Sequence, residues 1–548
     1  MSEQPHTDAA VIVAGAGPIG LTVAHILGKA GVPTIVVEAL TETIDYPRAV
    51  GVDDEALRVM QNIDMIDEVL PHTVPDQKIH MISGEGKVLA EINPPTREFG
   101  WPRRNGFVQP LVDHVLLEGV RRRESVDVRM GSELTGVRQD AEVVTVTVSP
   151  REGEPYELRA RYLVGCEGGS SFTRKALNVP FEGVTRRFKG LVIDVADDPL
   201  GNPHAIFGGD PTRPYASIRL PHGIRRWELG MLSAEEEAKA ENLDYVLELL
   251  RPHVPDVSKL KIIRHRLYNS NARIAGSFRS GRVFLAGDAA HVMPVNAGQG
   301  WNSGIRDAAN LGWKLVHVVQ GVCADGLLDT YDQERQAHVK AMLDLSVNMG
   351  RNIASRSKTR AVARDALATV ANRIPQVKEW FTEQKFKPLP HYTAGALVPS
   401  QRPRSRSVVV KDSWNSAVGR LFPQPRVSAT DGRRDVLLDD VTGGMRWRVF
   451  FWDNNPHAFL EEDSRAKLAA LGAQLVNVVP AVSLGYASEH AAEGVQVIGD
   501  HTGAFKTWFD ASPFSAFVVR PDNVVAAECL SSEAEATVRR LFAVLRLR

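Results

Sequence analysis

The chain has little cysteine, and its three cysteines are far apart. Cys166, Cys323 and Cys529 are the only ones among 548 residues, and no CxxC pair occurs. This spacing excludes a dithiol redox centre and offers no set of thiolate ligands, so we expect no metal site. Unpaired thiols are typical of a reducing compartment, and we therefore predict a cytoplasmic protein.

An excess of charge of one sign is also lacking. The formal net charge is −1, with 24% charged and 43% hydrophobic residues. A near-neutral chain has no electrostatic footprint for nucleic acid or for an anionic membrane surface. We expect a small-molecule partner, no nucleic acid and no membrane, and a length that suits two to four domains.

No apolar run is long enough and continuous enough to span a membrane. The longest candidate, Ala9–Leu27, contains His25 as its only ionisable side chain. However, no basic segment precedes it, and Gly15–Gly20 interrupts it with a turn, so it is neither a signal peptide nor a membrane helix.

That interruption is the first motif, V-I-V-A-G-A-G-P-I-G. Ala10–Ala14 predicts a buried parallel strand, Pro18–Lys29 a helix, and Thr34–Val37 a second strand that ends at Glu38. The glycines allow a tight turn and close approach to a pyrophosphate at the helix N-terminus, and the acid about twenty residues on can bind ribose hydroxyls. The candidate cofactor residues here are Gly15, Ala16, Gly17, Pro18, Ile19, Gly20, Glu38 and Ala39.

A second motif, G-R-V-F-L-A-G-D-A-A-H-V-M-P-V-N-A-G-Q-G-W-N, follows about 270 residues later. Arg282–Ala286 predicts a strand, Asp288 can accept from a ribityl hydroxyl, and a helix that begins near Asn302 can face the flavin. His291 is interpreted as structural rather than catalytic. Together and in this order, the two motifs indicate FAD. The candidates from this motif are Gly287, Asp288, Pro294, Gly298, Gln299, Gly300 and Asn302.

With Y-L-V-G-C-E-G-G-S-S-F-T-R between them, these motifs resemble the three fingerprints of single-component flavoprotein aromatic hydroxylases. In the middle fingerprint Glu167 replaces the usual Asp, which puts its role toward NAD(P)H in doubt. The segments Ile44–Gln61, Glu98–Pro110, Asn178–Gly183 and Asp210–Tyr215 narrow the resemblance to 3-(3-hydroxyphenyl)propionate and 3-hydroxycinnamate hydroxylases.

The resemblance implies an activity and several residue roles. NADH or NADPH would serve as a transient co-substrate with O2, and a second hydroxyl would be placed ortho to the phenolic one. No second GxGxxG is present for a separate nicotinamide domain. Arg48 and Gln109 would contact the flavin, although a surface ion pair and a polar cap are the alternatives.

Several residues are candidates for contact with the substrate. Asp53 is the preferred group near the phenol, with Asp54 and a helix N-cap role as alternatives. Tyr268 is a second catalytic candidate, and Tyr215 is expected in the substrate wall. Arg213 and Arg225 are candidate partners for a propionate carboxylate.

The predicted fold is α/β, or α+β overall. Residues 1–75, 101–185 and 275–385 would form a Rossmann-like FAD domain, and residues 76–100 and 186–274 an antiparallel substrate-binding sheet like that of p-hydroxybenzoate hydroxylase. A linker at 386–404 would precede a thioredoxin-like unit, 405–548, without a CxxC pair. This last unit would be structural or contribute to a homodimer contact.

Other functions on the same scaffold stay open. They are hydroxylation of another phenol or of a larger aromatic polyketide, a flavin reductase, and a non-catalytic flavin-binding protein. A halogenase is disfavoured because none of the nine tryptophans forms a Trp-x-Trp pair. Retention of the first and third fingerprints argues against a non-catalytic protein.

Overall fold

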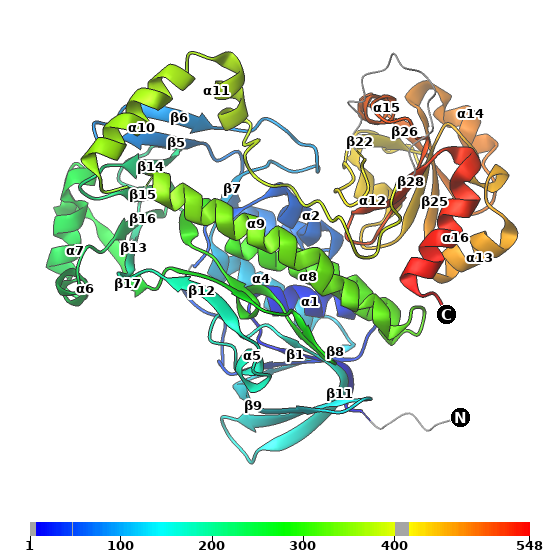
Figure 1. The fold of residues 1–548 in the computed structure, drawn as a ribbon, viewed down its shortest axis with the longest axis horizontal. Helices are drawn as coiled ribbons and strands as arrows, with labels where there is room; N and C mark the ends of the chain where they lie inside the picture. The colour runs from blue at the N-terminus through cyan, green and yellow to red at the C-terminus, as the bar shows by residue number, and fades with distance from the viewer. Residues whose placement is uncertain (1–6, 47, 354, 401–415) are drawn as a thin grey trace.

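The computed structural model describes residues 7–46, 48–353, 355–400 and 416–548. It confirms an α/β architecture with three sheet-containing bodies, and the C-terminal body packs beside the long helices of the first (Figure 1). The last part of the expected linker and the start of the expected C-terminal unit, residues 401–415, lie outside the described residues.

The first body is built on a parallel sheet with the strand order β20-β11-β1-β2-β8. The apolar β-branched run of β1 forms its centre, with Val11 opposite Thr34 on one neighbour and Tyr162 on the other. Both faces of such a strand are covered, which explains why it is apolar throughout. The strands are β1 Ala9–Ala14, β2 Thr34–Glu38, β8 Val126–Met130, β11 Tyr156–Gly165 and β20 Val283–Leu285.

Helices cover this sheet and position the candidate motifs. α1 (Pro18–Lys29) packs against α8 (Gly300–Val319) and α4 (Gln109–Arg121). α2 (Asp54–Asn62) begins after the short strand β3 (Gly51–Val52). Smaller elements of this body are α3 Ile66–Val69, β4 Thr73–Val74, β7 Asn105–Phe107, α5 Phe172–Ala176, β12 Phe181–Thr185, β18 Asn271–Ala275, β19 Arg279–Ser280 and β21 His291–Val292.

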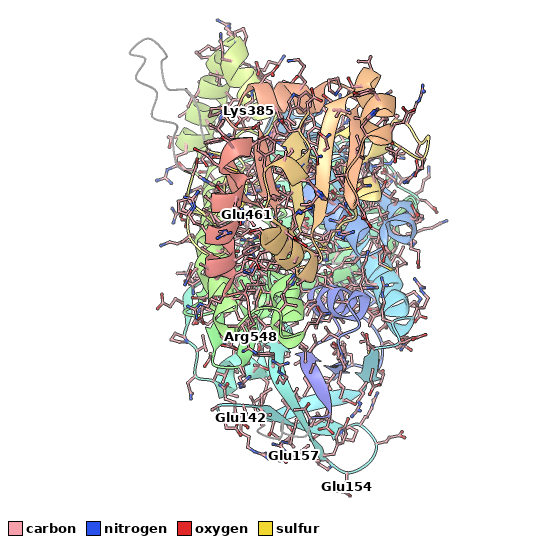
Figure 2. All side chains as sticks on the ribbon, turned by 90° about the vertical axis from the view of Figure 1, so that its right-hand side faces the viewer. Glu142, Glu154, Glu157, Lys385, Glu461 and Arg548 are labelled. Atoms are coloured by element: carbon pink, nitrogen blue, oxygen red, sulfur yellow. The ribbon has the colours of Figure 1, made fainter. Side chains whose placement is uncertain are left out.

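A meander extends the sheet away from the other bodies. β10 (Val144–Pro150) pairs antiparallel with β11, and β9 (Ser132–Gln139) pairs antiparallel with β10. Figure 2 shows Glu154 and Glu157 at the far end of the molecule, opposite Lys385. The loop that carries Glu154 and the start of β11 at Glu157 therefore form one end of the molecule.

The second body is a seven-stranded sheet, mostly antiparallel, with the order β17-β13-β16-β15-β14-β5-β6, and we refer to it as the substrate-side sheet. One face packs Leu191 and Trp227 against α7 (Leu243–Leu250), and the other faces the first body. Helices α9 (Asp329–Ile353), α10 (Lys358–Ala371) and α11 (Pro375–Thr382) lead across to it (Figure 1). Its remaining elements are β5 Ile79–Ser83, β6 Val88–Ile92, β13 Gly190–Ala196, β14 Ala205–Gly209, β15 Tyr215–Arg219, β16 Arg225–Gly230, α6 Ala234–Lys239 and β17 Lys261–Tyr268.

The third body has the strand order β23-β22-β26-β25-β24-β27-β28. β24 and β25 are parallel, and the hairpin β27–β28 continues the sheet antiparallel, as the thioredoxin-like prediction requires. Stacked phenylalanines, among them Phe422 and Phe450, fill its core. Its elements are β22 Arg426–Ala429, β23 Val436–Leu437, α12 Leu438–Thr442, β24 Arg448–Trp452, α13 Glu462–Ala470, β25 Gln474–Pro480, α14 Leu484–Glu489, β26 Val495–Asp500, α15 Ala504–Asp510, β27 Ala516–Val519, β28 Val525–Cys529 and α16 Ala534–Leu545.

A buried cluster of charges joins the third body to α8 and α9. Glu334 accepts two hydrogen bonds of 2.8 Å from Arg520 and one of 2.9 Å from Lys314. Arg520 also pairs with Asp522. Burial alone would raise the pKa of Glu334, but Arg520 and Lys314 outweigh it and hold the pKa at about 2. The ion pairs of Glu334 with Arg520 therefore form only while the two bodies stay together.

A second buried contact joins the third body to α2. Arg58 donates to both carboxylate oxygens of Asp439, at 2.8 and 2.9 Å, and Arg448 donates to the same carboxylate at 2.7 Å. The Gln61 amide donates to Asp440 at 2.6 Å. Helix α2 is thus fixed from the C-terminal side.

Candidate functional site

A single large cavity, about 1580 Å³, lies between the first body and the cavity-facing side of the substrate-side sheet. The turn after β1, the end of β2, and the segments around residues 48–51 and 292–301 line one part of it. Strands β5, β13, β14, β15, β16 and β17 line the other. The cavity is therefore continuous from the dinucleotide motif to the sheet.

The turn after β1 depends on its glycines. Gly15 has φ +103°, and a Cβ at this position would lie 2.6 Å from the carbonyl oxygen of Cys166. A Cβ on Gly20 would lie 2.0 Å from the Gly15 oxygen, whereas a Cβ on Gly17 would meet no atom within 4 Å. Gly17 borders the cavity, so the N-terminus of α1 is open to a ligand there. The other candidates of this motif, Ala16, Pro18, Ile19, Glu38 and Ala39, also line the cavity.

Glu38 lies at the end of β2, beside that turn. Its carboxylate accepts from the amide of Ala16 at 2.7 Å and from that of Leu40 at 2.9 Å. These bonds fix the carboxylate at the rim of the cavity, where remaining lone pairs can accept from ribose hydroxyls.

Arg48, Gln109 and Asp288 come together although they are far apart in the sequence. Arg48 donates to Asp288 at 2.9 Å, and the Gln109 amide oxygen accepts from the Arg48 and Ala49 backbone amides at 3.2 and 2.7 Å. Gln109 in turn donates to Asp113 at 3.0 Å. Burial raises the pKa of Asp113 to about 7. All five residues line the cavity, and Asp113 was not predicted from the sequence.

The loop before α8 lines the cavity through Pro294, Gly298, Gln299 and Gly300. Asn302 is not among the lining residues. Its side chain accepts from the Asp53 amide at 3.1 Å and donates to the carbonyls of Gly51 and Gly298 at 3.1 and 2.8 Å. Asn302 therefore holds this loop against β3 rather than facing the cavity.

Gly287 and His291 also lie behind the cavity wall. A Cβ on Gly287 would lie 2.7 Å from the Ile19 side chain, so this glycine allows close packing. His291 is fully buried, with one ring nitrogen 2.7 Å from Asp307. Its position is that of the structural histidine expected from the sequence.

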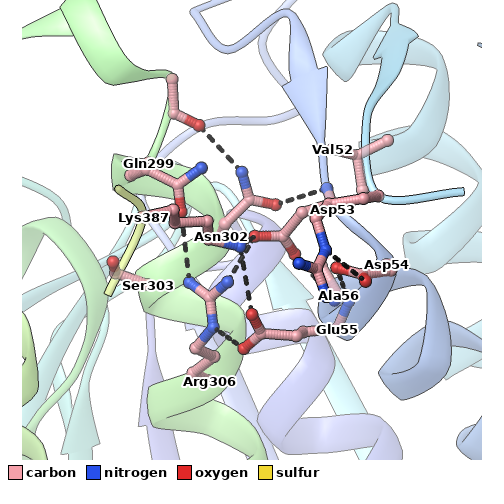
Figure 3. A network of polar contacts seen from close by, with 12 residues as sticks. Val52, Asp53, Asp54, Glu55, Ala56, Gln299, Asn302, Ser303, Arg306 and Lys387 are labelled. Atoms are coloured by element: carbon pink, nitrogen blue, oxygen red, sulfur yellow. Dashed lines mark hydrogen bonds and ion pairs between the residues drawn. The ribbon is translucent and has the colours of Figure 1, made fainter. Parts of the chain in front are cut away.

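Asp53 is the N-cap of α2 and belongs to a buried ion network (Figure 3). Its carboxylate accepts from the Ala56 amide at 3.0 Å, from Lys387 at 2.8 Å and from Arg306. Glu55 binds the same two cations, at 3.1 Å from Lys387 and 2.5 Å from Arg306. Asp53 does not line the cavity, whereas Lys387 does. Any effect of Asp53 on a substrate is therefore indirect.

Asp54, the alternative to Asp53, points elsewhere in the same buried region. It pairs with Arg103 at 3.3 Å and does not line the cavity. Burial raises the pKa of Asp54 to about 6, and the neighbouring Glu55 and Asp53 add to this effect.

The two tyrosine candidates border the cavity, and the two arginine candidates do not. Tyr268 lies over Gly190, where a Cβ would be 2.3 Å from the ring. Tyr215 lies over Gly208 in the same way. Arg225 is fully buried and bound to Asp198, and Arg213 pairs with Glu236 at 2.8 Å. Carboxylates of the second body thus already bind both guanidinium groups, and neither arginine reaches the cavity.

Sequence reasoning also missed other polar residues that line the cavity, among them Arg104, Glu228 and Lys387. Glu228 alternates with the buried Trp227 along β16, so strand periodicity could have placed it on the opposite face. No signal separates Arg104 from its neighbour Arg103, and Lys387 lies in the segment expected to be a linker.

Glu167, the unusual residue of the middle fingerprint, is bound locally. It accepts from the hydroxyls of Ser171 and Thr173, each at 2.7 Å, and from the Thr173 amide at 2.9 Å. Arg174 of the same fingerprint donates to the Ala289 carbonyl at 2.8 Å. The fingerprint therefore ties α5 to the segment that carries Asp288.

The described residues contain neither a membrane-spanning helix nor a metal-binding cluster. Among them, no helix is both long and apolar enough to cross a membrane. The same part of the chain contains no group of three or more His, Cys, Asp or Glu side chains placed to hold a metal ion.

Comparison with protein families gives two matches. Residues 8–346 match the model of the FAD binding domain family, and residues 419–544 match that of the HcaD C-terminal domain. The first match covers the sheet with the glycine turn, the substrate-side sheet and most of α9.

Curated relatives match along the whole chain. A 3-(3-hydroxy-phenyl)propionate/3-hydroxycinnamic acid hydroxylase of Mycobacterium sp. (strain JLS) is 47% identical over 100% of this chain and 94% of its own length. A protein of the same name from Escherichia coli (strain 55989 / EAEC) is 43% identical over 98% of this chain and 95% of its own length.

Solved structures show the same fold at lower identity. The flavin-dependent monooxygenase PieE, in complex with FAD and substrate, has a TM-score of 0.80 at 22% identity, covering 98% of this chain and 100% of its own. Aklavinone-11 hydroxylase, in a ternary complex with FAD and aklavinone, has a TM-score of 0.77 at 23% identity, with 99% of each chain covered.

Proposed function

Because the chain belongs to the family of FAD-dependent aromatic hydroxylases, we propose that it hydroxylates 3-(3-hydroxyphenyl)propionate or 3-hydroxycinnamate next to the phenolic hydroxyl. The products would be the 2,3-dihydroxy acids, and NADH or NADPH and O2 would be co-substrates. The observation that carries this substrate is the 47% identity, over the full length, to a relative of that name.

The residues present fit FAD. The open space at Gly17 and the N-terminus of α1 suit a pyrophosphate, and Glu38 suits the adenosine ribose. Arg48, Gln109 and Asp288 offer donors and an acceptor for the ribityl chain and ring. When bound, FAD supplies the reducing equivalents taken from NAD(P)H and the activation of O2.

The substrate-side sheet supplies the groups for the phenol. Burial raises the pKa of Tyr268, and Glu228 adds to this effect, so the hydroxyl stays protonated and can donate to the phenolic oxygen. Burial also raises the pKa of Glu228, which makes its carboxylate more basic. We assign Tyr268 as hydrogen-bond donor and Glu228 as the proton acceptor of this face.

Asp53→Asn is expected to slow hydroxylation about tenfold while FAD stays bound, because Lys387 loses one of its two carboxylates beside the cavity. Asn still caps α2, so the helix itself should persist. Stopped-flow measurement of product formation on FAD-loaded enzyme checks this, with the exposed cap variant Asp256→Asn as control. Unchanged turnover would remove Asp53 from the residues that affect the reaction.

Asp288→Ala is expected to weaken FAD binding at least tenfold without changing the fold. The variant removes an acceptor at the cavity wall and leaves the partly exposed Arg48 without its ion pair. Flavin fluorescence during dialysis measures the retained cofactor. Asp463→Ala, at an exposed ion pair of α13, is the matched control. An Asp288→Ala protein that retained its full content of FAD would contradict the placement of the second motif.

The proposed substrate is tested by oxidation of NADH and of NADPH with and without 3-(3-hydroxyphenyl)propionate, together with product analysis. Strong stimulation with a 2,3-dihydroxyphenyl product supports the proposal. Stimulation that yields only H2O2 identifies a non-substrate effector. Absence of stimulation by this acid, but turnover of another phenol, would refute the substrate assignment.

We also propose that the protein is cytoplasmic and that it forms a homodimer. The free buried cysteines Cys166, Cys323 and Cys529 support a reducing compartment. Exposed apolar side chains on α10, including Val362 at 70% and Leu367 at 71% exposure, support self-association. Sedimentation velocity decides the assembly, and a monomer at micromolar concentration would refute it.

A further inference from the structure

Part of the cavity wall is an apolar compartment on the substrate-side sheet. Ile79, Ala205, Phe207 and Ile218 of neighbouring strands line it, and Phe386 faces it from the segment after α11. Such a wall offers dispersion contacts and no hydrogen bonds, which suits an aromatic ring or a hydrocarbon chain.

Arg104 also lines this cavity, and its charge has no partner. No hydrogen bond or ion pair of its guanidinium occurs among the described residues, and its Nε is buried without a partner. Burial lowers the pKa of Arg104 to about 10, and only the more distant Asp53 partly offsets this effect. The adjacent Arg103, by contrast, pairs with Asp54 and Glu98.

Arg104 is only partly exposed and its Nε is buried, so its unpaired charge is poorly solvated and favours an anion that enters the cavity. The backbone fixes the position of Arg104, because its carbonyl accepts from the Gln77 amide at 3.1 Å and β7 begins at the next residue. Val52 of β3 pairs with Asn105 of β7, which brings the start of α2 beside Arg104. The carboxylates there, those of Asp53, Asp54 and Glu55, are already bound to Arg306, Lys387 and Arg103. The missing anion must therefore enter with a ligand.

We infer that Arg104 binds the carboxylate of the substrate, with the hydrocarbon part against the apolar compartment. The inference rests on the proposed function, because it concerns the acid group of that aromatic substrate. A guanidinium fork matches a carboxylate with two parallel hydrogen bonds. Arg104 therefore selects aromatic acids over neutral phenols, and Arg213 and Arg225 have no part in this selection.

The test compares 3-(3-hydroxyphenyl)propionate with 3-propylphenol, a neutral probe that keeps the ring and the three-carbon chain. Arg104→Met is expected to weaken binding of the acid about 100-fold and that of the neutral probe less than about threefold. The affinity of Arg104→Lys for the acid should lie between those of the wild type and Arg104→Met. Lysine keeps the positive charge but cannot form the two parallel hydrogen bonds of a guanidinium group. Perturbation of the flavin absorbance gives Kd without turnover, and KM and kcat are measured beside it.

Arg97→Met is the matched control, since Arg97 precedes β7 in the same segment and forms an exposed ion pair with Asp76. It should leave both probes unchanged. Equal loss of both probes in Arg104→Met would overturn the inference in favour of a packing role. Lowered FAD retention before any substrate is added would overturn it in favour of a flavin contact.

Failure of the proposed function is distinguishable from failure of this inference. Should the wild-type enzyme not hydroxylate 3-(3-hydroxyphenyl)propionate, the substrate proposal fails, and binding of the unreactive 3-phenylpropionate against its amide then tests Arg104. A preference for the acid that disappears in Arg104→Met supports the inference. Equal binding of acid and amide by the wild type overturns it.

Discussion

Glu334→Gln is expected to lower the free energy of unfolding by about 3 to 5 kcal/mol. The variant keeps the shape of the side chain but leaves Lys314 and Arg520 with Asp522 as the remaining carboxylate of the cluster. All these side chains are buried, so water cannot replace the lost charge. Urea denaturation of the FAD-loaded protein measures the effect.

The pH dependence of this loss follows from the pKa of Glu334, which falls from 4.5 to about 2 on folding. A depressed carboxyl pKa stabilises the fold fully above about pH 4.5, and the contribution disappears as the pH falls toward 2. For a shift of this size the contribution is about 3 kcal/mol. The difference between wild type and Glu334→Gln should therefore be greatest above pH 4.5 and should narrow below it.

Glu379→Gln is the control, because Glu379 forms an exposed ion pair with Lys385 and should show no measurable change. If Glu334→Gln also left the urea midpoint unchanged at neutral pH, the buried cluster would not hold the C-terminal body in place.

Gly15→Ala and Gly17→Ala are both expected to weaken FAD binding strongly, in two different ways. At Gly15 the added methyl group meets the Cys166 carbonyl and the backbone has φ +103°, so the protein itself should lose about 2 to 4 kcal/mol of stability. At Gly17 the methyl group meets no protein atom, and the extended backbone accepts alanine. Only the ligand is hindered there, and FAD should bind about 100-fold more weakly.

Two measurements separate these effects. Thermal unfolding of the cofactor-free proteins should show a lowered Tm for Gly15→Ala and an unchanged Tm for Gly17→Ala, while flavin fluorescence titration should show weak binding in both. Wild-type FAD affinity in Gly17→Ala would mean that the pyrophosphate lies elsewhere.

The elements with the strongest local signals were predictable. The strand expected at Ala10–Ala14 is β1 Ala9–Ala14, and the helix expected at Pro18–Lys29 is α1 with the same bounds. Apolar runs between glycine turns have few alternative structures, because both faces of a central parallel strand must be covered. The proximity of Arg48, Gln109 and Asp288 required the resemblance to known enzymes, since no local rule brings such distant residues together.

The substrate-side residues were not predictable from the sequence. An arginine in a strand gives no sign of whether a carboxylate of its own body will bind it, as Asp198 binds Arg225. The helix-cap role of Asp53 is local and was one of the alternatives that the sequence offered, but its ion pair with Lys387 depends on a segment 334 positions later in the chain. Charge pairing is settled by tertiary structure, so the sequence shows only which residues are available.

Helix α2 connects two regions that a protein engineer would wish to treat separately. Its first turn is anchored beside the cavity through Asp53, and its later turns are anchored to the C-terminal body through Arg58 and Gln61. A chimera that exchanges the C-terminal body between homologues must therefore also match Arg58 and Gln61 of α2 to the residues of the new body. Otherwise the new body would shift the start of α2 beside the cavity. Selectivity for the aromatic substrate would then change, although the exchanged body does not contact the substrate.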